Sequence, residues 1–127
     1  NSNVHNMMVE GDIGATNFYQ TSDRKVKKNI KKYSKGLKTI KEINTVQFEY
    51  NEKLPTAAGK KQIGVVAQEL EAVAPELVEY VTDEKGESLL TVKVIDLVYL
   101  LVNAVQEQQS TIELLQQQLE KIDTKSK

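Results

Sequence analysis

The C-terminal quarter of the chain carries a repeat of apolar residues that constrains the fold more than any other feature. Between residues 93 and 123 the spacing alternates strictly between four and three, and no Gly or Pro interrupts it. The positions are Val94, Val98, Leu101, Val105, Gln108, Ile112, Leu115, Leu119 and Ile122. A seam of this period over about four heptads is typical of a coiled coil, whereas a helix packed on a globular core shows a broader stripe. We therefore expect a long helix that assembles with other copies of the chain.

The number of chains in such a coiled coil is not fixed by the seam. β-Branched residues at one position and Leu at the other favour dimers, but this seam mixes Val, Ile and Leu. Gln108 is the polar exception, and a buried amide at such a position costs stability while it fixes the register. The periodicity alone is compatible with two or three helices.

The middle of the chain, residues 22–92, has the pattern of a compact α+β unit. The expected elements are a helix capped by Ser34 and ending near residue 43, a strand over 46–50, a loop over 55–59, a buried strand over 63–67, a helix over 68–73, and a hairpin of strands 78–82 and 88–92. The helix over 68–73 should end before Pro75, because proline disfavours helical backbone in the preceding residue. The hairpin turn, residues 83–86, contains the Asp and Gly that such turns favour.

Three segments therefore organise the chain. Residues 1–21 are rich in Asn and Gly, and Val9, Ile13 and Phe18 fit short strands at the end of a larger upstream structure. The α+β unit is expected over 22–92, and the coiled-coil helix with its tail over 93–127. The whole is predicted to be an α+β fold followed by a helix of an oligomeric coiled coil.

Composition excludes several classes of site. Of the 127 residues, 39% are hydrophobic and 28% charged, which suits one small domain with an extension. Without Cys, neither disulfides nor thiolate zinc sites can form. The single histidine, His5, has no ligand-like neighbours, so we expect no metal site. We also expect no membrane span and no signal peptide, since the sequence has no apolar run of the required length.

Positive charge is concentrated in one stretch, although the net charge is only −1. From Arg24 to Lys41 there are nine Lys or Arg residues and no acid. Such a stretch is compatible with a solvated basic face, an acidic partner or an anion, a nucleotide phosphate included. Nucleic acid is disfavoured, because Tyr33 is the only stacking aromatic there. No Gly-rich phosphate loop of the Walker type is present, so ATP is a secondary expectation and no cofactor is required.

The candidate catalytic residues are Ser22, just before this stretch, and Lys27, near its start. A serine hydroxyl becomes a nucleophile when a nearby base takes its proton, and a neutral lysine can serve. A separation of five residues does not align two side chains on a helix. A contact therefore requires an extended or turned backbone, or a lysine from another chain. By spacing alone the pattern is weak, since most Ser and Lys residues are simply exposed.

Four sequence blocks carry a resemblance to a known family. These are SDRKVKKNI, LKTIKEINTVQFEY, IGVVAQELEAVAPELV and LTVKVIDLVYLLVNAVQEQ, which occur in this order between residues 22 and 119. The chain resembles the peptidase S74 family, the intramolecular chaperone domains that end phage tailspikes, tail fibres and neck appendages. The resemblance implies a homotrimer that guides the upstream fibre into its intertwined form and then releases itself.

The resemblance also assigns roles to residues. Ser22 matches the nucleophile, Lys27 the base and Asp23 the partner beside the serine, so the implied cut is at the Thr21–Ser22 bond. Gln68 and Glu69 fall in a block that is similar to the family's central strand and helix start. They are expected to support the site, although a polar pair at a helix start is more often a cap or a packing contact.

The implied location is a virion appendage, on a precursor made in the host cytoplasm and released by the cut. Two alternatives remain open at this point. One is a trimerisation module of the same fold that does not cleave. The other is a coiled-coil adaptor whose basic segment binds an acidic partner or nucleic acid.

Overall fold

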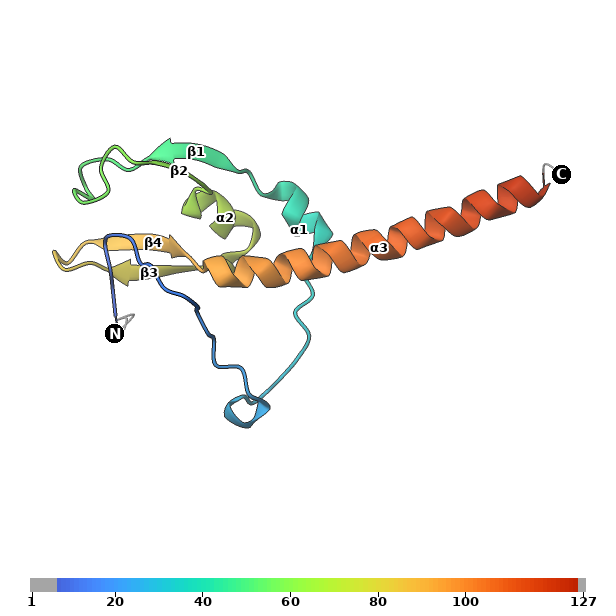
Figure 1. The fold of residues 1–127 in the computed structure, drawn as a ribbon, viewed down its shortest axis with the longest axis horizontal. Helices are drawn as coiled ribbons and strands as arrows, with labels where there is room; N and C mark the ends of the chain where they lie inside the picture. Colours follow the sequence, from blue (N-terminus) through green and yellow to red (C-terminus); the bar gives the residue numbers. More distant parts are fainter. Residues whose placement is uncertain (1–6, 126–127) are drawn as a thin grey trace.

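A long helix and two small antiparallel sheets make up the molecule (Figure 1). The computed structural model describes residues 7–125. In chain order the elements are η1 (Arg24–Val26), α1 (Leu37–Glu42), β1 (Val46–Glu49), β2 (Lys61–Gly64), α2 (Ala67–Val73), η2 (Pro75–Leu77), β3 (Val78–Thr82), β4 (Ser88–Val92) and α3 (Val94–Lys125). The α+β architecture with a long C-terminal helix is therefore confirmed.

The β3–β4 hairpin matches its prediction residue for residue. Val78 pairs with Val92 at one end and Thr82 with Ser88 at the other. The Asp83 carboxylate accepts hydrogen bonds from the Lys85 amide at 2.9 Å and the Glu87 amide at 2.8 Å. Gly86 has φ +83°, a left-handed conformation that glycine adopts without strain. The acidic turn residue and the glycine thus fix the hairpin.

The other sheet corrects one prediction. β2 begins at Lys61 and ends at Gly64, so the expected buried strand over 63–67 lies too far along the chain. Ile63 is 77% exposed, because β2 has β1 as its one neighbour and nothing covers that side of Ile63 in the described chain. The apolar run was therefore wrongly interpreted as a buried strand. Its last residue, Ala67, begins α2, which ends at Val73, before Pro75, as expected.

The start of α1 corrects another prediction. The helix begins at Leu37, with Gly36 as its N-cap residue, so Ser34 is not the cap. The preceding backbone is engaged elsewhere, because the carbonyls of Tyr33 and Lys35 accept hydrogen bonds from Asn103. A contact with a distant helix thus delays the helix start by two residues.

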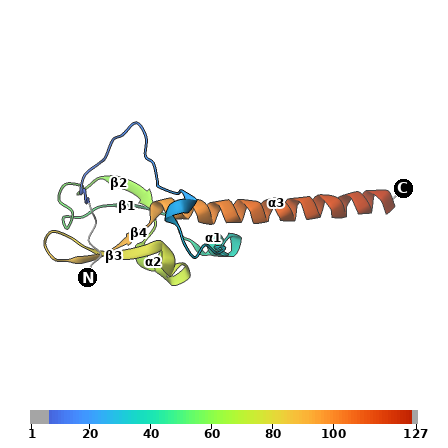
Figure 2. The same cartoon turned by 90° about the horizontal axis from the view of Figure 1, so that it is seen from below.

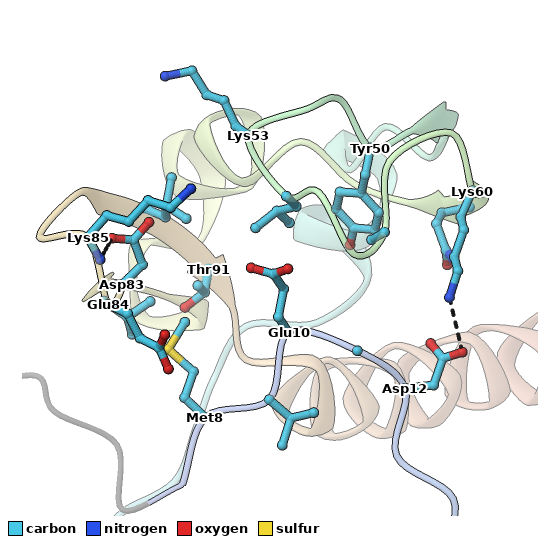
Figure 3. Close-up of a pocket in the computed structure, with 17 residues that line it drawn as sticks. Met8, Glu10, Asp12, Tyr50, Lys53, Lys60, Asp83, Glu84, Lys85 and Thr91 are labelled. Carbon is cyan, nitrogen blue, oxygen red and sulfur yellow. Dashed lines mark hydrogen bonds and ion pairs between the residues drawn. The ribbon is translucent and has the colours of Figure 1, made fainter.

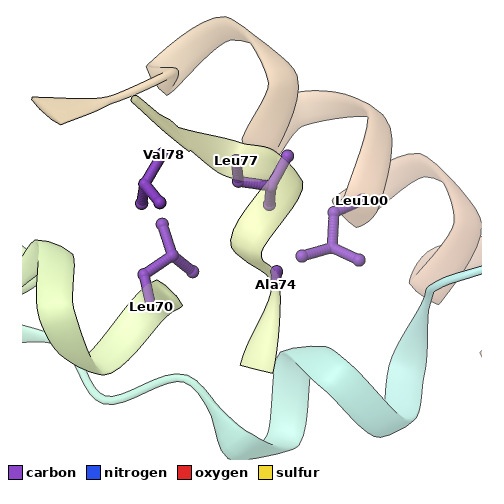
Figure 4. Close-up of a cluster of buried hydrophobic side chains, with 5 residues drawn as sticks. All are labelled: Leu70, Ala74, Leu77, Val78 and Leu100. Carbon is purple, nitrogen blue, oxygen red and sulfur yellow. The ribbon is translucent and has the colours of Figure 1, made fainter. Parts of the chain in front are cut away.

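The buried core lies where α2, η2 and the first turns of α3 meet. Its buried members are Leu70, Ala74, Leu77, Val78 and Leu100 (Figure 4). Leu100 is 0% exposed and Leu70 only 2% exposed. Fully burying one such leucine contributes about 1.5–3 kcal/mol. This small core holds the N-terminal end of α3 against the α+β unit.

Helix α3 extends far beyond that core. Its 32 residues correspond to about 48 Å. Leu100 and Ala104 are buried, whereas every described residue from 105 to 125 is exposed. Figure 2 shows α1 and α2 beside the first half of α3, and the second half projecting away. Among the described residues, no helix has the length and apolar character needed to cross a membrane.

The upstream segment does not form the expected strands. Over residues 7–21 the backbone has no regular structure, and Phe18 is 72% exposed. A strand requires a partner for its backbone hydrogen bonds, and within residues 7–125 of one chain no strand pairs with this segment. The strand prediction for Val9, Ile13 and Phe18 is therefore wrong for the single chain. His5 lies outside the described residues.

Candidate functional site

Ser22 and Lys27 are in contact within one chain. Lys27 Nζ donates a hydrogen bond to Ser22 Oγ at 2.6 Å. The intervening residues form the turn η1, in which the Val26 amide donates to the Asp23 carbonyl at 3.1 Å. The turn shortens the path between the two side chains, which a regular helix would not align. The pair is thus close enough for a neutral lysine amine to take the serine proton.

Asp23 stabilises this turn. Its carboxylate accepts a hydrogen bond from the Lys25 amide at 2.8 Å, as an N-cap residue does at a helix start. The carboxylate also lies 4.0 Å from Lys25 Nζ, but both side chains are exposed, so this ion pair contributes little. Asp23 therefore holds the backbone that places Ser22 and Lys27 together.

The contact between Ser22 and Lys27 is open to solvent. Every residue from 7 to 32 is exposed in the single chain. Figure 1 shows the turn η1 on a loop that lies apart from both sheets. Hydrolytic sites of this type work best where water is excluded and hydrogen-bond donors face the reacting carbonyl. The single chain supplies the pair but not an enclosure around it.

Gln68 and Glu69 lie apart from this pair. Both are exposed residues in the first turn of α2. The Glu69 carboxylate accepts a hydrogen bond from the Asn44 side chain at 3.4 Å, rather than contacting Ser22 or Lys27. Thr21, on the other side of the expected cut, is exposed as well. A supporting role for Gln68 and Glu69 stays a prediction.

Glu76 fixes the middle of the basic stretch to the core. Its carboxylate accepts hydrogen bonds from Tyr33 Oη at 2.6 Å and from Lys35 Nζ at 3.0 Å. Lys35 Nζ also donates to the Val73 carbonyl at 3.1 Å. We call these contacts the Glu76 tether. Partial burial raises the pKa of Glu76, but the hydrogen bonds from Tyr33 and Lys35 outweigh it and leave the pKa below its ordinary value. Burial and the bond to Glu76 raise the pKa of Tyr33.

Helix α3 holds the same stretch from the other side. Asn103 Nδ2 donates to the carbonyls of Tyr33, at 3.0 Å, and Lys35, at 2.7 Å. The Leu37 amide donates to the Glu107 carboxylate at 3.3 Å. The chain that leaves the Ser–Lys turn is therefore bound to the helix that carries the apolar seam. This link was not predicted from the sequence, and the one signal for it was Asn103 within the otherwise apolar run of residues 97–105.

Gly36 allows this close approach. A Cβ atom there would overlap the Glu107 carboxylate and lie 3.2 Å from Asn103 Cβ. The carboxylate belongs to a flexible side chain, but Asn103 Cβ is fixed on the helix. A larger residue at position 36 would therefore push α1 away from α3.

The apolar seam of α3 is uncovered. Its members Val98, Leu101, Val105, Ile112, Leu115 and Leu119 are all about half exposed or more. Val98, Leu101 and Val105 line a shallow apolar hollow on this surface. Leu100 and Ala104 belong to an adjacent face, which packs inside the chain. A contiguous apolar strip of this kind marks an interaction surface.

Together these features define a small α+β domain with a Ser–Lys contact and a long helix whose free face has coiled-coil spacing. Residues 22–79 match the model of the Peptidase_S74 family, which is described as chaperone of endosialidase. Residues 22–79 therefore form a domain of this family, as the sequence blocks predicted.

Two curated relatives extend the match. They are the long tail fiber protein Gp37 of Enterobacteria phage K3 and that of Enterobacteria phage T2. Each is 33% identical over 108 residues, which is 85% of this chain. The chain spans 9% of the K3 protein and 8% of the T2 protein, so it corresponds to a small part of each.

Proposed function

We propose that this chain is the folding chaperone of a phage tail fibre, which assembles as a homotrimer through α3 and then cuts itself off at Thr21–Ser22. The observation that carries the cleavage is the 2.6 Å contact between Lys27 Nζ and Ser22 Oγ in a domain of this family. The uncovered seam of α3 supports the assembly, and the phage fibre relatives support the upstream partner.

The proposed chemistry follows from the place of Ser22 beside the cut. Neutral Lys27 takes the Ser22 Oγ proton, and Oγ attacks the carbonyl carbon of Thr21. The bond from that carbon to the Ser22 nitrogen breaks, the nitrogen receives the proton, and an ester to Oγ forms. Water then hydrolyses the ester, which leaves a carboxylate on Thr21 and a free α-amine on Ser22. The reaction occurs once per chain.

Assembly would switch this chemistry on. The Ser–Lys turn is exposed in one chain, while the Glu76 tether and Asn103 hold its C-terminal flank near the seam helix. Packing of three α3 helices would bring neighbouring chains over this region and exclude water. Cleavage would then follow completed folding, and loss of the chaperone would make unfolding of the fibre hard to reverse.

The seam also explains the chaperone role. Three helices that associate locally hold the upstream segments at a high effective concentration. Long-range β pairing is slow, so fibre strands gain most from such registration. The precursor would be made in the host cytoplasm and reach the virion as part of the fibre. No cofactor is required. The many exposed lysines of the basic stretch would nevertheless attract the phosphates of ATP.

Substitution of the two residues tests the cleavage. A longer chain that carries upstream fibre sequence should yield a product that begins at Ser22. Ser22→Ala and Lys27→Ala should slow this cleavage by roughly a hundredfold or more. Lys28→Ala, a change at the adjacent exposed lysine, should cleave like the parent chain.

Each rival function has its own outcome. If Ser22→Ala and Lys27→Ala cut as fast as the parent, the catalytic assignment is wrong. A trimer that never cuts would favour a trimerisation module without cleavage. Retention on DNA that weakens steeply with salt would favour the adaptor with a basic binding segment.

A further inference from the structure

A groove separates the two hairpins at the end of the molecule away from the α3 tip. It has a volume of about 570 Å³ and lies between the loop that joins β1 to β2 and the tip of the β3–β4 hairpin. Apolar side chains line part of it, among them Leu54, Ala57 and Val81, and Val81 is 1% exposed. Lys53, Lys60 and Lys85 add positive charge to its walls, and Asp83 and Glu84 add negative charge at the tip of the β3–β4 hairpin. The groove thus combines an apolar lining with charged edges in which basic residues are in excess.

The upstream segment lies across this groove. Residues 8–12 line it from the side opposite the loop, and Glu10 points toward that loop (Figure 3). The Glu10 carboxylate accepts a hydrogen bond from the Thr56 amide at 3.2 Å. Asp12 lies 3.4 Å from Lys60 Nζ. Two acids of the segment therefore meet a backbone donor and a basic side chain.

The Glu10 contact sets the position of the segment. A carboxylate bound to a backbone amide has a defined geometry, whereas the Asp12–Lys60 pair is largely exposed and contributes little. Hydrogen bonds from Thr56 lower the pKa of Glu10 and outweigh the opposing effect of burial, while the charges of Lys85 and Asp83 act in opposite directions. Gly11 lies close to the loop. A Cβ atom at this position would be 3.9 Å from the Thr56 methyl group, which is an ordinary van der Waals distance.

We propose that this groove is a binding site for an extended acidic peptide, and that its occupant is the upstream segment around Glu10 and Asp12. The site lies far from the cut along the chain, because residues 13–21 separate it from Ser22 and span roughly 30 Å when extended. Breaking the Thr21–Ser22 bond would not disturb the contacts of Glu10. This has a consequence for cleavage, which itself rests on the proposed function. After the cut, the upstream segment stays bound until it dissociates from the groove.

Hydrogen exchange tests the binding without cleavage. The full chain with Ser22→Ala is compared with the same chain that also carries Glu10→Ala. Loss of the carboxylate should speed exchange of the Thr56 amide by about tenfold, because its acceptor is gone. Glu10→Gln keeps a weaker acceptor and should fall between. Glu52→Ala removes an acid in the same loop that does not line the groove, and it should leave Thr56 exchange unchanged.

Amides of the β3–β4 hairpin report that the fold is intact and should exchange alike in all variants. If the Thr56 amide exchanges as fast in the Ser22→Ala chain as with Glu10→Ala added, the groove is not a binding site for this segment. That result would leave the cleavage proposal standing.

Retention of the cut segment gives a second readout. With an affinity tag upstream, the cleaved parent chain should keep its C-terminal part on the resin, and Glu10→Ala should release it sooner. Release from the parent as fast as from Glu10→Ala would overturn the groove proposal, while cleavage itself would be upheld. A parent chain that fails to cut would contradict the proposed function, and the exchange data would still decide the groove.

Discussion

At the scale of single residues, the turn from Ser22 to Lys27 depends on Asp23. The Asp23 side chain accepts from the Lys25 amide, and its carbonyl accepts from the Val26 amide. Both contacts bend the backbone so that Lys27 Nζ reaches Ser22 Oγ. Asp23 touches neither of the two reacting side chains in these contacts. We therefore regard Asp23 as a positioning residue in the proposed cleavage.

Two substitutions at Asp23 separate positioning from charge. Asn caps helix starts about as well as Asp, whereas Ala removes the cap at a cost of about 0.5–2 kcal/mol. Asp23→Asn should therefore cut at nearly the parent rate, and Asp23→Ala roughly tenfold more slowly. Time courses of product formation in the longer chain measure both rates. If Asp23→Asn is as slow as Asp23→Ala, the negative charge itself takes part and the positioning role is wrong.

At the scale of elements, α3 presents two faces with different partners. Leu100 and Ala104 pack inside the chain, and Asn103 on the same side binds the stretch that follows the Ser–Lys turn. Val98 and Leu101 lie on the uncovered seam. A helix with these two faces would connect assembly of the chains to the position of the basic stretch.

A change at Asn103 tests this inner face. Asn103→Leu removes both donors to the carbonyls of Tyr33 and Lys35, which are then left without their partner. The expected loss is about 1–3 kcal/mol in the free energy of unfolding. Gln117→Leu makes a similar change on the exposed second half of α3 and should have little effect. Urea denaturation of both variants measures the loss, and equal stability would show that the Asn103 contacts contribute nothing.

Periodicity and turn chemistry predicted the regular elements well. The seam located α3, the Asp and Gly of residues 83–86 located the β3–β4 hairpin, and Pro75 located the end of α2. Such signals come from residues that are close together in the chain, so they can be recognised in a single sequence. The start of α1 and the exposure of Ile63 were missed, because both depend on what lies next to them in space.

The site was predictable to a similar degree. Family resemblance pointed to Ser22 and Lys27, and their spacing showed that a turned backbone was needed for contact. The Glu76 tether joins residues 38 to 43 positions apart, and Asn103 reaches its partners over 68 and 70 positions. Contacts over such separations leave no periodic pattern in one sequence. The groove around Glu10 was missed for the same reason.

At the scale of the whole molecule, one chain leaves two surfaces incomplete. The seam of α3 exposes apolar side chains along most of its length, and the Ser–Lys turn has no enclosure. Both would be completed by further copies of the chain. A homotrimer is the assembly that the family resemblance implies, and it would bring each turn beside neighbouring chains.

Native mass spectrometry of the longer chain, with collisional release of its subunits, tests the central claim most directly. One spectrum gives the number of chains in the assembly, and the released subunits give the position of the cut. We predict three copies of a C-terminal chain that begins at Ser22, whether or not the cut upstream segments stay bound to it, and uncut chains in a trimer when Ser22 is replaced by Ala. Monomers, dimers, or a C-terminal chain that begins at any other residue would contradict the account.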